Sequence, residues 1–255
     1  MTEMRHAVTR IRRERQRRAI TVAEKTLLSP SMLRIRFESP ELVGFDSAAP
    51  DDHVKLFLDT PEQAENGRPA MRDYTPRSFD AAAGVLVIDF ALHEAGPATR
   101  WAVEASVGDR IQIGSPQGST VIADDFDWYL LIGDETALPA IARRVEELRP
   151  GVTALVVAVI DGPDDRIAIA GAAAVAVTWV TRAGATIPDE ALLQRALQEI
   201  ALPQGEGYIW IAAEAAVARA IRHYIVEERH HPRVWTKASG YWTLGHADRH
   251  ERIDD

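Results

Sequence analysis

Two different hydrophobic patterns divide the chain near residue 122. In the first part, apolar and polar residues alternate over short segments, most clearly at 33–37 and 54–58. Such alternation is typical of strands with one buried face. Gly and Pro residues separate these segments from further apolar strands at 85–92 and 111–113. Several short strands at this spacing predict an antiparallel β-barrel.

The second part alternates compact apolar runs with segments of helical periodicity. The strands are expected at 128–132, 152–160, 175–180 and 208–212, and the helices at 141–148, 189–200 and 215–228. Apolar runs without alternation indicate strands that are buried on both faces of a sheet. The sequence therefore predicts two domains, an antiparallel β-barrel followed by a doubly wound α/β domain. The expected parts are a basic N-terminal segment (1–18), the barrel (19–124), the α/β domain (125–245) and a polar tail (246–255).

Composition narrows the possible chemistry. The chain has 255 residues and no cysteine, which excludes disulfides, thiolate nucleophiles and cysteine-ligated metal centres. Without disulfides, a cytoplasmic location is expected. The formal net charge of −9 argues against nucleic acid as a partner. The longest uncharged stretch, 167–180, is shorter than the roughly 20 apolar residues that cross a bilayer. We therefore expect a buried segment there and no membrane insertion.

Positive charge is concentrated at the N-terminus. Residues 1–18 hold seven arginines and two glutamates, so the remaining chain is more acidic than the whole. Basic runs of this kind contact membranes or RNA in some proteins, but a solvated and frayed terminus is the more common arrangement. We expect the frayed terminus here.

The first candidate ligand-binding segment has the sequence RDYTPR, at 72–77. In an extended segment Arg72 and Tyr74 lie on one face, whereas Thr75 turns away or offers its backbone. A guanidinium beside a flat aromatic ring suits a ligand that has both a phosphate and a ring system. The alternative is a proline-containing turn with a surface arginine.

The second candidate segment, at 89–102, changes from a strand to a helix. Gly96 and Pro97 precede small residues, a pattern that begins a helix. The backbone N–H groups of Ala98 and Thr99 at such a helix N-terminus bind phosphate readily. His93 lies just upstream and either donates to the same phosphate or is an ordinary strand-end histidine.

The third candidate segment has the sequence GDETALPA, at 133–140, and directly follows an apolar strand. It lies at the carboxyl end of the first parallel strand, where open α/β sheets bind ligands. It is neither a dinucleotide fingerprint nor a Walker A sequence. The alternative is an ordinary strand-to-helix connection with Thr136 as the cap.

Three histidines and a glutamate near the C-terminal helix are residue types that bind metals, but their pattern does not predict a metal site. His223, His230 and His231 lie close to Glu227 in the sequence. Nothing in the pattern fixes their orientation, so a solvated helix end is expected and no metal is.

Taken together, these segments resemble the siderophore-interacting protein family. Its members are FAD-containing ferric-siderophore reductases of the ferredoxin-reductase-like superfamily. The order and spacing of the motifs are specific, and the resemblance spans about 18–245. The motifs are DHVKL (52–56), RDYTPR (72–77), DFALH (89–93), GPA (96–98), WA (101–102), GDETALPA (133–140) and GYW (240–242).

The resemblance implies roles for individual residues. The residues implied at the FAD are Arg72, Tyr74, Thr75, Asp89, His93, Ala98 and Thr99. The residues implied near the nicotinamide nucleotide are Gly133, Asp134, Glu135, Thr136, Ala137 and Glu214. Lys55 matches a lysine expected in the family at the substrate, and Lys237, Tyr241 and Trp242 are candidates for the same opening. Since the flavin carries the chemistry, no catalytic side chain is expected.

Two segments depart from the family pattern. The sequence at 212–214 is AAE, where the family usually has Gly before the glutamate. Thr243 and Leu244 follow the GYW motif, where the family often has arginine. One positive charge fewer predicts a preference for less charged chelates, such as hydroxamates, over tris-catecholates.

The implied function is the flavin-dependent reduction of a ferric siderophore to release ferrous iron, by a monomer that takes electrons from NADPH or NADH through FAD. Two alternatives remain: a reductase of the same fold with another acceptor or with ferredoxin as its partner, and a non-catalytic siderophore or flavin carrier. NADP usually requires an arginine near the ribose phosphate. Arg182, Arg143 and Arg144 are all candidates, so the choice of nicotinamide stays open at this point.

Overall fold

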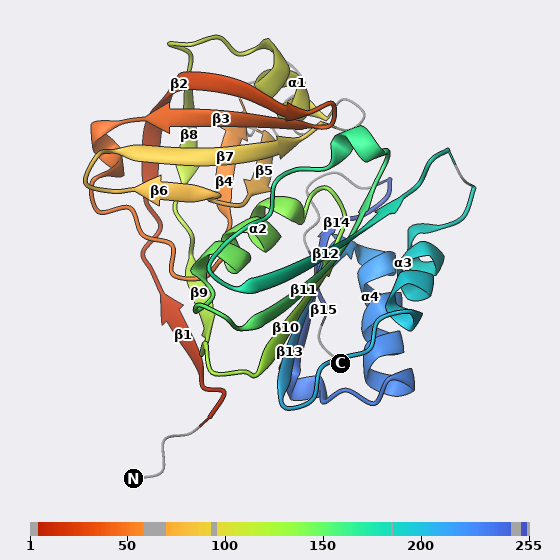
Figure 1. The fold of residues 1–255 in the computed structure, drawn as a ribbon. Helices are drawn as coiled ribbons and strands as arrows, with labels where there is room; N and C mark the ends of the chain where they lie inside the picture. Colours follow the sequence, from red (N-terminus) through yellow and green to blue (C-terminus); the bar gives the residue numbers. More distant parts are fainter. Residues whose placement is uncertain (1–4, 59–69, 93–95, 185, 246–250, 254–255) are drawn as a thin grey trace. The chain divides into compact units, whose positions relative to one another are not determined.

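The computed structural model describes residues 5–58, 70–92, 96–184, 186–245 and 251–253. The chain divides into two compact units, Met1–Ala123 and Asp124–Asp255 (Figure 1). Each unit has its own main sheet and its own hydrophobic core. No helix within these described ranges is long and apolar enough to cross a membrane.

The first unit is a barrel-like sheet of seven antiparallel strands in the order β5-β4-β8-β2-β3-β7-β6. The strands are β2 (Arg17–Ser29), β3 (Met32–Glu38), β4 (Val54–Leu58), β5 (Ala70–Tyr74), β6 (Ser78–Asp80), β7 (Val85–Ala91) and β8 (Arg110–Gly114). In β3 the alternation is as predicted, because Leu33, Ile35 and Phe37 are buried and Arg34 and Arg36 are not. The antiparallel barrel predicted from the sequence is confirmed.

Helix α1 (Pro97–Glu104) lies between β7 and β8 along the chain. Lys25 of β2 donates from Nζ to the carbonyl oxygens of Val103 and Ala105, at 2.8 and 2.5 Å. A cation at the carboxyl end of a helix satisfies carbonyl groups that have no helical partner. The ring of Trp101 stacks on Phe37 in the core, with a centroid distance of 6.3 Å. The hydrogen bonds of Lys25 and the stacking of Trp101 together hold α1 against the sheet.

The N-terminal segment differs from the expectation of a frayed end. Strand β1 (Val8–Arg12) pairs antiparallel with β9 (Gly118–Ile122) in a separate two-stranded sheet. All five side chains of β1 are exposed, so backbone hydrogen bonds rather than burial hold it. The next arginines also find partners: Arg13 bonds to Asp46 and Ser119, and Arg18 is buried against the carbonyl oxygen of Glu41.

The second unit is built on a six-stranded sheet in the order β12-β11-β10-β13-β14-β15. The first five strands are parallel and β15 is antiparallel to β14. In chain order this is 3-2-1-4-5-6, so the direction of winding reverses between β10 and β13. The strands are β10 (Trp128–Gly133), β11 (Thr153–Ile160), β12 (Ala174–Thr181), β13 (Gly207–Glu214), β14 (Thr236–Trp242) and β15 (Glu251–Ile253).

Helices cover both faces of this sheet, which confirms the doubly wound prediction (Figure 1). They are α2 (Leu138–Glu147), α3 (Asp189–Gln198) and α4 (Ala215–His223), with a π-helical turn (Tyr224–Glu228) after α4 and short 3₁₀ turns at Pro40–Leu42, Pro163–Asp165 and Arg233–Trp235. Apolar residues of α3 and α4 form one core with the sheet, among them Leu193, Leu197 and Ile221.

One expectation for the second unit is wrong. The stretch 167–180 is not buried, because only Ala173 within it is enclosed. Its strand, β12, lies at the edge of the sheet and exposes alternate residues. Within the segment expected as a polar tail, β15 pairs with β14 and Ile253 is buried.

Candidate functional site

Several of the residues expected at the FAD come together in the first unit. Arg72 and Tyr74 lie on β5, and Thr75 follows it directly. Tyr74 shares a side-chain hydrogen bond with Thr99 of α1, and its ring lies 4.5 Å from that of Phe90. Burial raises the pKa of the Tyr74 phenol above its ordinary value, although the charge of Arg72 opposes this. The neutral Tyr74 phenol therefore links the first candidate segment (72–77) to the second (89–102) through its hydrogen bond with Thr99.

The N-terminus of α1 fits a phosphate group. Gly96 caps the helix without a side-chain hydrogen bond, and a Cβ atom at Gly96 would meet nothing within 4 Å. The first N–H groups of a helix have no helical acceptor and attract anions. Ala98 and Thr99 occupy these positions and are buried. Arg72, whose charge acts on Tyr74 beside Thr99, adds a positive group to the same region.

Asp89 does not fit its expected contact with the cofactor. Its side chain is fully buried, and both carboxylate oxygens accept hydrogen bonds from Arg34, at 2.7 Å each. Nε of Arg77 lies 3.8 Å from the same carboxylate. Asp89 therefore forms ion pairs with two arginines of the barrel, which is a structural role. His93, expected near the phosphate, lies outside the described residues.

Lys55, expected at the substrate, lies on β4 and is paired with its neighbour on β5. Its Nζ lies 2.8 and 3.0 Å from the two carboxylate oxygens of Asp73. The two residues are directly opposite each other in the antiparallel register. The charge of Lys55 is therefore compensated, and its contact with substrate stays a prediction.

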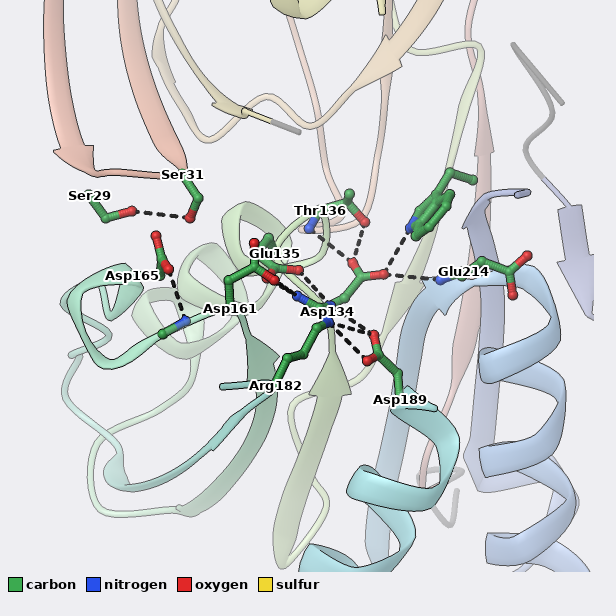
Figure 2. A network of polar contacts seen from close by, with 12 residues as sticks. Ser29, Ser31, Asp134, Glu135, Thr136, Asp161, Asp165, Arg182, Asp189 and Glu214 are labelled. Atoms are coloured by element: carbon green, nitrogen blue, oxygen red, sulfur yellow. Dashed lines mark hydrogen bonds and ion pairs between the residues drawn. The ribbon is translucent and has the colours of Figure 1, made fainter. Parts of the chain in front are cut away.

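In the second unit, the third candidate segment begins at Gly133, where β10 ends. Figure 2 shows the three residues that follow, Asp134, Glu135 and Thr136. A Cβ atom at Gly133 would lie 2.5 Å from both Cβ of Ala137 and the carbonyl oxygen of Ala212. Both neighbours are fixed, because they belong to the start of α2 and to β13. Only glycine permits this close approach, so the backbone at Gly133 packs directly against β13 and the start of α2.

Asp134 is the hub of this segment. Its Oδ1 accepts from the backbone N–H of Thr136 at 2.9 Å and from the Thr136 hydroxyl. Its Oδ2 accepts from the backbone N–H of Glu214 at 3.0 Å and from the indole N–H of Trp242 at 2.9 Å. Burial raises the pKa of Asp134, and the hydrogen bonds from Thr136 and Trp242 oppose the increase. One carboxyl group thus joins the ends of β10, β13 and β14.

Glu214 and the GYW motif complete the same edge of the sheet. Glu214 caps α4, because its Oε2 accepts from the N–H groups of Ala216 and Val217 at 2.6 and 3.2 Å. A bulge places Tyr241 as an extra residue on β14, with its ring edge-on to Trp210 at 6.0 Å. Lys237 is half-buried on the same strand, opposite Trp210.

Arg182 forms a second network at this edge, with partners that were not expected from the sequence (Figure 2). Its guanidinium is bonded to Glu135, Asp161 and Asp189. Burial alone would lower the pKa of Arg182, but the hydrogen bonds that it donates to Asp189 and Glu135 outweigh this effect, and the pKa is raised. Burial also raises the pKa of Glu135, which the charge of Arg182 opposes.

Of the other two candidate arginines, Arg143 is buried and bonded to Glu147 within α2, at 2.7 Å. Arg144 is half-exposed on the same helix. His231, expected at a solvated helix end, is instead buried, and its Nδ1 lies 2.9 Å from Oγ1 of Thr236. That burial lowers the pKa of His231.

The contacts missed from the sequence join residues far apart in the chain. Asp134 and Trp242 are separated by 108 positions, and Arg182 lies 47 positions from Glu135. No local spacing signals such pairs. What they share is topology, because each follows or ends an apolar parallel strand, and the carboxyl ends of parallel strands meet at one edge.

Comparison with known proteins agrees with this architecture. The model of the siderophore-interacting FAD-binding domain matches residues 21–67 and 61–120, and that of the siderophore-interacting protein matches 126–245. The NADPH-dependent ferric-chelate reductase of Escherichia coli is 30% identical over 252 residues, which cover 91% of this chain and 95% of the relative. The ferric vibriobactin reductase of Vibrio cholerae is 26% identical over 265 residues, which cover 93% and 96%.

Among solved structures, a siderophore utilization protein from T. fusca superimposes with a TM-score of 0.85 and 31% identity, covering 97% of this chain and 99% of that one. The siderophore-interacting protein SipS from Aeromonas hydrophila superimposes with a TM-score of 0.77 and 28% identity, covering 93% and 94%. Both units of the chain are therefore matched in sequence and in structure. The chain belongs to the siderophore-interacting protein family.

Proposed function

We propose that this protein is a flavin-dependent ferric-siderophore reductase, with FAD as its cofactor and a reduced nicotinamide nucleotide as its electron donor. The observation that carries the proposal is the arrangement of Arg72, Tyr74 and the N-terminus of α1 within a unit that matches the family's FAD-binding domain. The names of the relatives in Escherichia coli and Vibrio cholerae, both ferric-chelate or ferric-siderophore reductases, support the same reaction.

The side chains of this chain bind and orient rather than react. Arg72 and the N–H groups of Ala98 and Thr99 neutralise phosphate charge, and the hydrogen bond to Thr99 holds Tyr74 in place. When bound, FAD supplies the exchange between a two-electron donor and a one-electron acceptor. Ferric iron in the siderophore is the substrate, and its reduction weakens the grip of hard oxygen ligands. No proton transfer by the protein is required.

The finer assignments are also proposals. We place the siderophore opening in the second unit at Tyr241 and Trp242, at the carboxyl end of β14. Lys237 lies near the start of the same strand, so we assign it no contact with the substrate there. Lys55 belongs to the first unit, where Asp73 compensates its charge. The nicotinamide nucleotide is placed along 133–137 and Glu214, at the point where the winding of the sheet reverses. We further propose that the protein acts as a monomer in the cytoplasm.

The test begins with the visible spectrum of the purified protein, which should show bound flavin. Anaerobic mixing with NADH or NADPH should bleach that flavin, and a ferric siderophore with a ferrous-iron chelator should restore it. A protein that neither retains nor takes up FAD would refute the proposal. Flavin that is reduced but passes no electrons to any ferric chelate would exclude the siderophore as substrate.

Arg72→Ala is the residue-level test of the FAD site. Loss of a charge-assisted hydrogen bond costs about 1.5–3 kcal/mol, so the dissociation constant of FAD should rise roughly 10- to 150-fold. The matched control is Arg110→Ala, which removes the same charge at an exposed position of β8. Equal FAD affinity for both variants, measured by equilibrium dialysis, would remove Arg72 from the site.

A further inference from the structure

We propose that the second unit selects NADH over NADPH, and that Arg182 with its carboxylate partners sets this choice. The inference rests on the proposed function, in which a nicotinamide nucleotide is the electron donor. It concerns the end of the nucleotide that carries the adenosine ribose, where NADP differs from NAD by one phosphate.

Asp161 and Arg182 lie where the adenosine ribose of the nucleotide is expected to bind. Asp161 directly follows β11 and Arg182 directly follows β12. In open sheets with this winding the nucleotide lies across the carboxyl ends of the strands. There an acidic side chain accepts hydrogen bonds from the ribose hydroxyls of NAD, whereas an arginine binds the additional phosphate of NADP. The chain offers both residue types at this edge, so their mutual contacts decide between the two nucleotides.

The guanidinium of Arg182 is already saturated. Nε lies 2.9 and 3.2 Å from the two carboxylate oxygens of Asp189, and Nη2 lies 2.7 Å from Asp189 and 3.0 Å from Glu135. Nη1 bonds to Glu135 and, at 2.7 Å, to Asp161. These contacts use each of the N–H donors that an arginine has. A phosphate would therefore bind Arg182 only by displacing a carboxylate.

The charge of the cluster also opposes a phosphate. Three carboxylates surround one guanidinium, so the cluster is negative as a whole. Asp161 is its most accessible member, with 71% of the side chain exposed, against 14% for Glu135 and 20% for Asp189. A ribose with two hydroxyl groups can donate to Asp161 without disturbing Arg182. A ribose phosphate would instead place like charges side by side.

The experiment measures preference in the FAD-loaded protein. Rates of flavin reduction are compared for NADH and NADPH, and dissociation constants for NAD⁺ and NADP⁺ are measured by calorimetry. We expect kcat/KM to favour NADH by about tenfold at low salt, as like charges a few ångströms apart repel. The preference should shrink as ionic strength rises, because exposed charges are screened beyond roughly 10 Å at 0.1 M.

Asp161→Asn tests the residue assignment, because it removes the most accessible negative charge and leaves Glu135 and Asp189 on Arg182. We expect NADP⁺ to bind severalfold more tightly to this variant. The matched control is Asp164→Asn, an equal charge change at an exposed position of the same connection. It should leave the ratio of the two dissociation constants close to that of the wild type.

Each outcome bears on a separate claim. A wild type that prefers NADPH, or does not discriminate, would overturn the inference while leaving the reductase function intact. Equal shifts in Asp161→Asn and Asp164→Asn would remove Asp161 from the selection. If neither nucleotide binds or reduces the flavin, the donor assignment in the proposed function fails, and the inference fails with it.

Discussion

The Asp134 side chain can be removed by Asp134→Ala, with a predictable effect on the second unit. The carboxyl group accepts hydrogen bonds from the N–H groups of Thr136, Glu214 and Trp242, and it is 2% exposed. Alanine leaves these three donors without that acceptor. An unsatisfied buried donor costs about 1–3 kcal/mol, and neighbouring losses are not additive, so we expect a loss of about 2–4 kcal/mol in the free energy of unfolding.

Asp134→Asn separates hydrogen bonding from charge. The amide oxygen keeps the contacts to Glu214 and Trp242, and the NH₂ group can donate to the Thr136 hydroxyl, so only the Thr136 amide loses its partner. Because burial raises the pKa of Asp134, the folded wild type holds this proton more tightly than the unfolded chain. The stability from that proton is present at low pH and is lost as pH rises through the raised pKa. Asp134→Asn should therefore lower the free energy of unfolding by at most about 1 kcal/mol at neutral pH.

Urea unfolding followed by tryptophan fluorescence measures both variants. Five of the six tryptophans lie in the second unit, so the signal reports mainly on the part of the chain that holds Asp134. Relative to Asp134→Asn, the wild type should lose stability as pH increases above the ordinary carboxyl range. If asparagine is as damaging as alanine at neutral pH, the negative charge itself is required. If alanine is harmless, the hydrogen bonds contribute nothing and the reasoning is wrong.

Three further predictions follow from single contacts. Gly133→Ala should lower the free energy of unfolding by about 1–3 kcal/mol, because the added Cβ overpacks the site. In the control Gly162→Ala, the Cβ would meet only Asp165 Oδ2, at 3.7 Å, so the stability should hardly change. Equal unfolding midpoints for the two variants would contradict this. Tyr74→Phe keeps the ring but loses the bond to Thr99, so thermal unfolding should reveal a loss of about 1 kcal/mol, and an unchanged stability would show that the bond adds nothing. Burial lowers the pKa of His231, so wild-type stability should fall as pH drops from about 6.5 towards that lowered pKa, and His231→Gln should lack this slope; parallel pH profiles would refute it.

The fold was largely predictable because periodicity is a local property. Alternation in β4, where Val54, Leu56 and Leu58 are buried, and the wholly buried run of β10 were both sufficient to assign their strands. Strand β1 escaped prediction because all of its side chains are exposed and its pairing with β9 depends on the backbone. The burial of β12 was overestimated because an apolar sequence does not reveal whether its strand lies at the edge of a sheet.

The candidate site was predictable in its residues but not in its contacts. Motifs located Asp134, Trp242 and Lys55 correctly within strand ends or strands. The bond between Asp134 and Trp242 depends on the order of strands in the sheet, which no spacing along the chain reveals. The pairing of Lys55 with Asp73 likewise depends on the register of β4 and β5. Sequence therefore identified the groups, whereas their charge states and partners required the tertiary structure.

The pairing of β1 with β9 has a practical consequence for any shortened form of this protein. Strand β1 is the sheet partner of β9 in the two-stranded sheet, and the side chains of Val8–Arg12 are all exposed. Trimming this arginine-rich segment as if it were a dispensable leader would leave a row of backbone amides and carbonyls unpaired along β9. An uncovered strand edge of that kind recruits strands from other molecules. A truncated protein should consequently precipitate more readily than the full chain, even though its core would be untouched.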